Sequence, residues 1–204
     1  MTRDPAGEWI ALFDGTSLDA WRGYRMDAMP AGWEIVGTDL VRTGPAGDII
    51  TREQFGSFEL ELEWQVGPGG NSGIFYRVTE EGENTYHTGP EMQILDDDAH
   101  RDGLSPLTSA GAAYGLYPVP EGAARPAGEW NTARILLDGD HVTTWLNGVE
   151  TADYVLGSED WERRVQGSKF VEWPGYGRAA RGHIGLQDHG DTVWYRKIKI
   201  RERR

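Results

Sequence analysis

The chain has 204 residues, a length that suits one domain with a substantial buried core. Its formal net charge of −13 argues against binding to nucleic acid or anionic membranes, because both attract clustered Lys and Arg side chains. The absence of cysteine excludes disulfides, thiolate nucleophiles and cysteine-ligated metals. No apolar run approaches the roughly 20 residues of a membrane helix, and residues 1–5 contain no apolar leader. We therefore expect a cytoplasmic protein, or a secreted one if a leader has been removed.

Short runs in which apolar and polar residues alternate occur along the chain and predict half-buried β-strands. The clearest run covers residues 58–66 and ends at the breaker Gly67-Pro68-Gly69-Gly70. In chain order, the predicted strands are residues 33–36, 39–42, 58–66, 74–79, 91–95, 133–137, 141–146, 182–187 and 193–200.

Turn signals join several of these strands. Asp138-Gly139-Asp140 and Asn147-Gly148 predict hairpins, because Gly supplies a positive φ, and the chain continues as a strand from Val149. One short helix is predicted over residues 158–165, with Ser158 as its N-cap. Many short strands with frequent turns predict a single all-β domain over residues 1–204, built as a sandwich or a barrel.

Strand alternation assigns polar side chains to common faces. The sets that share a face are Phe75 with Arg77, Glu91 with Gln93, Trp145 with Asn147, and His183 with Gln187 and His189. A plain solvated strand is richer in Lys, Glu and Thr. Amides, by contrast, both donate and accept hydrogen bonds, and Arg binds adjacent oxygens in a fork. The combination predicts a face that binds a polyhydroxylated ligand such as a carbohydrate.

Three local sequences on these strands carry a family resemblance. They are Asn71-Ser72-Gly73-Ile74-Phe75-Tyr76-Arg77, Glu91-Met92-Gln93-Ile94-Leu95-Asp96 followed by His100, and Gly182-His183-Ile184-Gly185-Leu186-Gln187-Asp188-His189-Gly190. Further matches are Leu12-Phe13-Asp14-Gly15 with Trp21, Glu129-Trp130-Asn131, Trp145-Leu146-Asn147-Gly148 and Ser168-Lys169-Phe170. In this order, from about residue 9 to residue 200, the chain resembles the 3-keto-disaccharide hydrolase domain family.

The resemblance implies a fold and a reaction. The fold is a concanavalin A-like jelly-roll β-sandwich of two antiparallel sheets, with the ligand cleft on a concave face. The reaction is cleavage of a glycoside that is already oxidised to a ketone at C3. Because the ketone acidifies the proton on C2, a general base can remove it and form an enolate. The glycosidic oxygen then leaves from C1, and water adds back.

Candidate site residues follow from this chemistry and are assigned as hypotheses. His189 and Glu91 are the acid and the base, with the division of roles left open. Arg77, Lys169 and Gln187 are candidates to hold the ketone or enolate oxygen. The other candidates for substrate binding are Asn71, Gln93, Trp145, His100 and Asp96.

Rival functions remain at this level. A conventional glycosidase needs two carboxylates flanking the bond, but Glu91 and Asp96 lie on opposite faces of a regular strand. A non-catalytic carbohydrate-binding module would use the same aromatic, amide and Arg side chains. A plain interaction domain would bind no sugar.

The expected partner is a small carbohydrate, with no cofactor and no metal as the first expectation and with the oligomeric state left open. Asp96-Asp97-Asp98 is an alternative site for a hard cation such as calcium, although an acidic run in a loop is usually just solvated. The run opens an aperiodic loop over residues 96–128, and long loops in compact domains are often functional.

Overall fold

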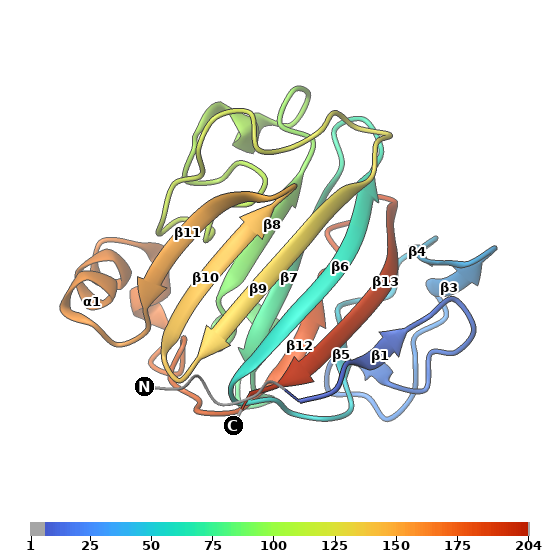
Figure 1. The fold of residues 1–204 in the computed structure, drawn as a ribbon, viewed down its shortest axis with the longest axis horizontal. Helices are drawn as coiled ribbons and strands as arrows, with labels where there is room; N and C mark the ends of the chain where they lie inside the picture. The colour runs from blue at the N-terminus through green and yellow to red at the C-terminus, as the bar shows by residue number, and fades with distance from the viewer. Residues whose placement is uncertain (1–6, 204) are drawn as a thin grey trace.

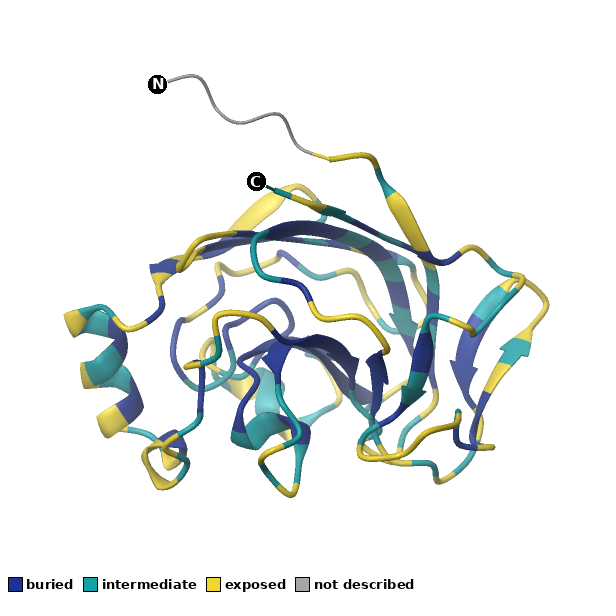
Figure 2. Ribbon diagram, turned by 90° about the horizontal axis from the view of Figure 1, so that it is seen from below, coloured by how far each residue is buried: buried dark blue, intermediate teal, exposed yellow. Residues whose placement is uncertain are grey.

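The computed structural model describes residues 7–203, so the leader prediction, which concerned residues 1–5, falls outside the described part. Two antiparallel sheets pack face to face (Figures 1 and 2). The larger sheet runs in the order β11 (Val149–Val155), β10 (His141–Leu146), β9 (Asn131–Asp138), β6 (Phe58–Val66), β13 (Val193–Glu202), β4 (Asp39–Arg42) and β3 (Trp33–Val36), with β1 (Ile10–Phe13) also paired to β13. The smaller sheet runs in the order β2 (Trp21–Gly23), β5 (Ile49–Thr51), β12 (His183–Leu186), β7 (Asn71–Val78) and β8 (Glu91–Leu95).

The core lies between the two sheets because each strand turns its apolar face inward. In β6, the apolar residues from Phe58 to Val66 are buried, while Glu61, Glu63 and Gln65 are half-buried on the opposite face. From the smaller sheet, Ile74 and Tyr76 of β7 and Ile94 of β8 join the same core. Figure 2 shows this as two layers in which the buried residues concentrate. The predicted sandwich is therefore confirmed.

Most predicted strands have the bounds expected from alternation. The strands β3, β4, β6, β8 and β10 coincide with the predicted ranges. Three short strands, β1, β2 and β5, were not predicted. The residues of β5 are all buried between β2 and β12, so this strand reads as a brief apolar run without alternation.

The α-helix found within residues 7–203 follows the capping prediction. Helix α1 (Glu159–Gln166) begins after Ser158, whose hydroxyl accepts a hydrogen bond from the Trp161 backbone N–H at 3.2 Å. Trp161 and Val165 are buried and anchor the helix beside the sandwich, next to β11 in Figure 1. Within residues 7–203, no helix combines the length and apolar character needed to cross a membrane.

Candidate functional site

The candidate site lies on the face of the smaller sheet that turns away from the core. Glu91 on β8 pairs with Phe75 on β7, and Gln93 pairs with Gly73, so their side chains share one face with Asn71. Gln187 follows β12 and donates its backbone N–H to Gly73 O at 3.0 Å, which places it beside them. The alternation of these strands thus assembles one polar face from three segments that are distant in sequence.

A cavity of about 250 Å³ opens on this face. It brings together six of the predicted residues: Asn71, Glu91, Gln93, Lys169, Gln187 and His189. Three further residues complete the lining: Tyr86, Asp102 and Tyr114. Their segments are the 3₁₀-helices η1 (Thr85–His87) and η2 (Arg101–Leu104) and the loop that follows η2. Lys169 begins a third such helix, η3 (Lys169–Glu172).

Glu91 is the most strongly perturbed acid of the cavity. Its side chain is buried, and burial raises its pKa to about 8, although the nearby Lys169 ammonium pulls the pKa down. The negative charges of Asp48 and Asp102 push it up further. A carboxyl group whose pKa lies this close to neutrality can exchange a proton during a reaction at physiological pH.

Two neighbours fix the position of the Glu91 carboxyl group. With its amide nitrogen turned toward the acceptors, Gln93 donates to Glu91 Oε1 at 3.3 Å and to Ser72 O at 3.0 Å. On the other side lies the backbone of Gly73, where an added Cβ would sit 2.0 Å from Glu91 Oε1. Gly73 therefore provides the space that Glu91 occupies.

We expect Gly73→Ala to lower turnover about 100-fold, because even a shift of about 1 Å in a catalytic group costs this much. The new Cβ would force the Glu91 carboxyl group out of its present position. Steady-state kinetics on a 3-keto glycoside, with circular dichroism to confirm folding, measures the effect. Gly44→Ala is the matched control, because a Cβ at Gly44 meets nothing within 4 Å. Equal kinetics for the two variants would show that the Glu91 position is not critical.

The ammonium group of Lys169 lies at the cavity beside three aromatic rings. Its Nζ lies 4.7 Å from the ring centroid of Tyr114, 5.4 Å from that of Phe170 and 5.9 Å from that of Tyr86. Among the described residues, no carboxylate oxygen lies within 4.0 Å of this nitrogen. The aromatic rings position the cation and leave its N–H donors available to a ligand oxygen.

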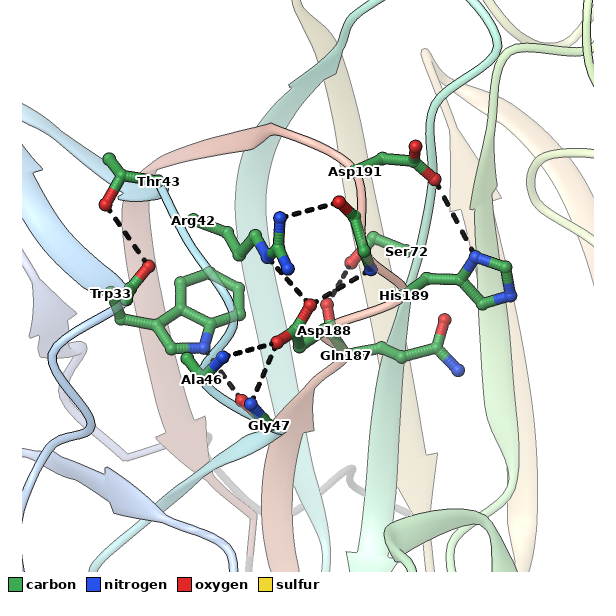
Figure 3. A network of polar contacts seen from close by, with 12 residues as sticks. Trp33, Arg42, Thr43, Ala46, Gly47, Ser72, Gln187, Asp188, His189 and Asp191 are labelled. Carbon is green, nitrogen blue, oxygen red and sulfur yellow. Dashed lines mark hydrogen bonds and ion pairs between the residues drawn. The ribbon is translucent and has the colours of Figure 1, made fainter.

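Gln187 and His189 flank Asp188 in the sequence, and a buried ion pair between Asp188 and Arg42 holds this segment in place. Asp188 points the opposite way from its two neighbours, as Figure 3 shows, and Arg42 Nε lies 2.7 Å from its Oδ1. Burial alone would raise the pKa of Asp188. The backbone N–H groups of Ala46 and Gly47, each 2.8 Å from Oδ2, help to hold that pKa below its usual value. This network fixes the backbone from which the two flanking side chains project.

His189 is exposed and lies beside Asp191. Its Nδ1 lies 3.7 Å from Asp191 Oδ2, and the same carboxylate oxygen accepts the Asn71 backbone N–H at 3.2 Å. His100 lies behind it, with ring centroids 6.1 Å apart and with its Nε2 3.5 Å from Asn71 Nδ2. His100 therefore contacts two lining residues without being part of the lining.

Two buried amide oxygens of the cavity have no hydrogen-bond partner within residues 7–203: Asn71 Oδ1 and Gln187 Oε1. Buried polar atoms are normally hydrogen-bonded, and exceptions often mark a place where a ligand or water completes the bonding. Both residues line the cavity. Hydroxyl groups of a sugar are suitable donors for both oxygens.

The structure corrects the placement of Arg77. A bulge interrupts the pairing of β7 with β12 between Phe75 and Val78, and Arg77 itself has a positive φ of 55°. Val78 consequently returns to the side of Phe75, and the two pack in one cluster. Arg77 instead donates to Asp140 Oδ1 at 2.8 Å and to Gly139 O at 2.6 Å. Its guanidinium group joins the β9–β10 turn and does not line the cavity.

Trp145 also lies elsewhere. It belongs to β10 in the larger sheet, where its ring stacks under Arg134 of β9 at 4.2 Å from the guanidinium carbon. Its neighbours Thr144 and Leu146 are buried, so Trp145 faces outward on the opposite side of the sandwich from the site. The prediction that Trp145 faces away from the core is confirmed. Alternation within one strand, however, does not show which of the two sheets that strand joins.

Asp96 is a third correction. Its Oδ2 accepts the Gly69 backbone N–H at 2.7 Å and its Oδ1 accepts that of Asp98 at 3.3 Å, while Asp97 accepts the Ala110 N–H at 2.8 Å. These carboxylates organise the start of the long loop. No group of three or more metal-ligating side chains suited to an ion occurs in the part of the chain that the structure describes.

Sequence reasoning missed Tyr86, Asp102 and Tyr114. Asp102 and Tyr114 lie in the long loop over residues 96–128, and its length was the one signal that pointed to function. Tyr114 is positioned by its backbone N–H, which donates to Glu91 O at 3.0 Å, and its hydroxyl donates to Asp102 Oδ2 at 3.3 Å. Nothing local in the sequence marks Tyr86, which packs on the cluster of Ile50, Phe75 and Val78.

Comparison with known proteins places these features in context. A model of the 3-keto-alpha-glucoside-1,2-lyase-like domain matches residues 8–201. A protein of Bacteroides thetaiotaomicron (strain VPI-5482) named 3-keto-disaccharide hydrolase is 36% identical over 228 aligned positions, covering 96% of this chain and 79% of that protein.

Solved structures agree with the sheet arrangement. A crystal structure of a candidate glycosyl hydrolase from Parabacteroides distasonis ATCC 8503 superposes with a TM-score of 0.90 at 31% identity, covering 96% of this chain and 94% of that one. The catalytic domain of a laminarinase from Thermotoga petrophila RKU-1 matches with a TM-score of 0.55 at 13% identity, covering 97% and 99%. The second likeness concerns the fold alone, and the two together confirm the jelly-roll β-sandwich.

Proposed function

Since the chain belongs to the family of 3-keto-α-glucoside-1,2-lyase-like domains, we propose that it cleaves the glycosidic bond of 3-keto glycosides by elimination followed by hydration. The observation that carries the proposal is the pairing of Glu91, with a pKa of about 8, and the Lys169 ammonium in one cavity. A proton acceptor beside an anion-stabilising cation is what enolate formation requires.

The first step is removal of the C2 proton. Glu91 in its ionised form takes this proton, and the electron pair moves into the C2–C3 bond as the ketone oxygen becomes an enolate oxygen. Lys169 donates to that oxygen and stabilises its charge, with the side-chain amide of Gln187 as a further candidate contact. Lys169 is exposed to solvent and lines the cavity, with its ammonium group beside the rings of Tyr114 and Tyr86, so its N–H donors are available to a ligand oxygen there.

The second step breaks the bond between C1 and the glycosidic oxygen. The enolate electrons form the C1–C2 double bond and restore the ketone, and the leaving oxygen takes a proton from His189. Asp191 Oδ2 lies 3.7 Å from His189 Nδ1, beside the ring that gives this proton. Addition of water to the unsaturated ketone places a hydroxyl on C1 and a proton on C2. The net reaction is hydrolysis.

A conventional glycosidase is the second candidate function, because one observation favours it. Asp102 lines the same cavity as Glu91 and raises the Glu91 pKa. Hydrolysis of a glycoside without a ketone usually uses two carboxyl groups that flank the glycosidic bond. Asp96, the partner considered from sequence, is bound to backbone N–H groups instead.

Product analysis separates the two functions. The protein is mixed with a 3-keto disaccharide and, separately, with the unoxidised parent sugar, in deuterated solvent. We expect cleavage of the keto sugar alone, with deuterium incorporated at C2. Cleavage of the parent as well would support the two-carboxylate glycosidase. Cleavage of neither, with sugar binding detected by calorimetry, would instead identify a carbohydrate-binding module.

A further inference from the structure

A second cavity of about 390 Å³ adjoins the one that holds Glu91. The two cavities share Tyr86, Gln187 and His189 in their linings, so they meet along these three side chains. Glu91 and Lys169 line only the first cavity. Ligand sites usually have volumes of about 300–1,000 Å³. The first cavity is smaller than this range and suits a single ring, and the two adjoining cavities together suit a larger ligand.

The second cavity offers an apolar surface beside polar groups. Tyr24 packs on the cluster of Ile50, Phe75 and Val78, and its hydroxyl donates to Gly82 O at 2.7 Å and to Thr79 O at 3.1 Å. These bonds fix the ring of Tyr24. Met26 is 45% exposed and lines the same cavity, so its thioether is accessible to a ligand. An aromatic ring and a thioether beside an amide, that of Asn84, suit one apolar face and one hydroxylated edge of a sugar ring.

The charge of the second cavity is of one sign. Asp48, Glu83 and Asp188 line it, and no Lys or Arg of the described chain does. Asp188 is neutralised by its ion pair with Arg42, so the negative charge offered to a ligand comes from Asp48 and Glu83. Burial raises the pKa of Asp48, although a hydrogen bond from Thr85 opposes this. An anionic ligand would therefore be disfavoured here, whereas a neutral hydroxylated ring would meet acceptors for its hydroxyl groups.

We propose that this second cavity is the subsite for the leaving group, and that it selects a neutral hydroxylated ring over an anionic one. The inference rests on the proposed function, which places the 3-keto ring in the cavity of Glu91 and Lys169. The order of the groups then follows the order of the atoms along the substrate. Lys169 meets the C3 oxygen, Glu91 meets C2, and His189, at the junction, meets the glycosidic oxygen between the rings.

A third cavity of about 610 Å³ is the competing location for the leaving group. It lies along the long loop and is lined by Asp96, Leu104 and Arg125, among others. It shares no lining residue with the cavity of Glu91. The short helix η2 divides them, since Asp102 lines one cavity and Gly103 the other. A disaccharide that spanned these two cavities would have to cross η2.

The test compares two substrates that share the keto ring: a 3-keto disaccharide and the methyl 3-keto glycoside, which has almost nothing to place in the second cavity. For Met26→Ala and Asn84→Ala, we expect the ratio of kcat/KM for the disaccharide to that for the methyl glycoside to fall about five- to tenfold, which is the loss of one contact of about 1 kcal/mol. Leu104→Ala and Arg125→Ala in the third cavity are the controls, and their ratios should match that of the wild type.

A charge variant tests the selection of a neutral ring. The wild type should disfavour a 3-keto disaccharide whose leaving sugar carries a carboxylate, and Glu83→Lys should reduce this discrimination about fivefold, because it replaces an exposed like charge by an opposite one. An unchanged ratio in the Met26 and Asn84 variants, or a lowered ratio in the Leu104 and Arg125 variants, would overturn the subsite. No turnover of either keto substrate by the wild type would instead overturn the proposed function itself.

Discussion

Glu91→Gln is expected to lower kcat on a 3-keto glycoside by about 10²–10⁴-fold, the usual contribution of a general base. The amide has nearly the shape of the carboxyl group, so we expect the side chain to keep its position between Gln93 and Gly73. Only the ability to take the C2 proton is lost. Steady-state kinetics and loss of deuterium exchange at C2 would both report this.

The pH dependence of the wild-type reaction shows whether Glu91 acts as a base or as an acid. A base must be ionised, so the rate of C2 proton removal, measured by deuterium exchange, should rise about tenfold per pH unit below pH 8 and level off above it, because the pKa of Glu91 is about 8. This first step does not use the proton that His189 gives to the leaving oxygen. If Glu91 were the acid, deuterium exchange would not follow this rise. A profile flat through this range would mean that Glu91 does not take part in proton transfer.

Stability should change with pH through the same group. The usual pKa of 4.5 applies to Glu91 in the unfolded chain, and burial raises it to about 8 in the folded one. Between pH 4.5 and 8 the folded protein keeps a proton on Glu91 that the unfolded chain has released. The contribution of Glu91 to the free energy of unfolding is therefore fully present below pH 4.5 and is lost as the pH rises through 8. Glu91→Gln should therefore be more stable than the wild type at pH 9, with a smaller difference at pH 5.

Urea denaturation at the two pH values measures this difference, and Glu172→Gln serves as the control because Glu172 is an exposed acid on η3. We expect the control to match the wild type in stability and in turnover. A Glu91→Gln variant with no gain in relative stability at pH 9 would mean that burial does not raise the pKa of Glu91.

Lys169→Met is expected to lower kcat about 10²–10³-fold, the range seen when one preorganised donor to a developing oxyanion is removed. The Met side chain keeps most of the apolar contact with Tyr114 and Tyr86 and removes the charge. Because the ammonium lowers the pKa of Glu91, its removal should also move the midpoint of the deuterium-exchange profile to higher pH.

Lys199→Met is the matched control for this experiment. Lys199 on β13 also places its Nζ over an aromatic ring, 4.4 Å from the centroid of Trp9, but on the larger sheet. Its replacement should leave both the rate and the pH profile as in the wild type. If Lys169→Met lowered the rate without moving the midpoint, the electrostatic coupling between Lys169 and Glu91 would be absent. If it lowered neither, the enolate would be stabilised by another group.

The sequence by itself determined the all-β class, most strand bounds and the pairing of Glu91 with Gln93 on a non-core face. These features depend on alternation, which is a property of neighbouring residues and is readable wherever a strand has one buried face. The same rule was wrong for Arg77, because the bulge in β7 adds one residue and reverses the faces beyond it. It was silent on β5, which is buried throughout.

Only the tertiary structure showed which of the candidate residues meet in one cavity and which further residues complete it. Tyr86, Asp102 and Tyr114, which the sequence did not mark, come from segments that are far apart in the chain and meet Glu91 only when the loops fold over the smaller sheet. The raised pKa of Glu91 has the same origin, because desolvation depends on everything that packs around a carboxyl group. Alternation can turn a side chain away from the core, but the packing of distant segments determines whether that side chain meets water or a closed cavity.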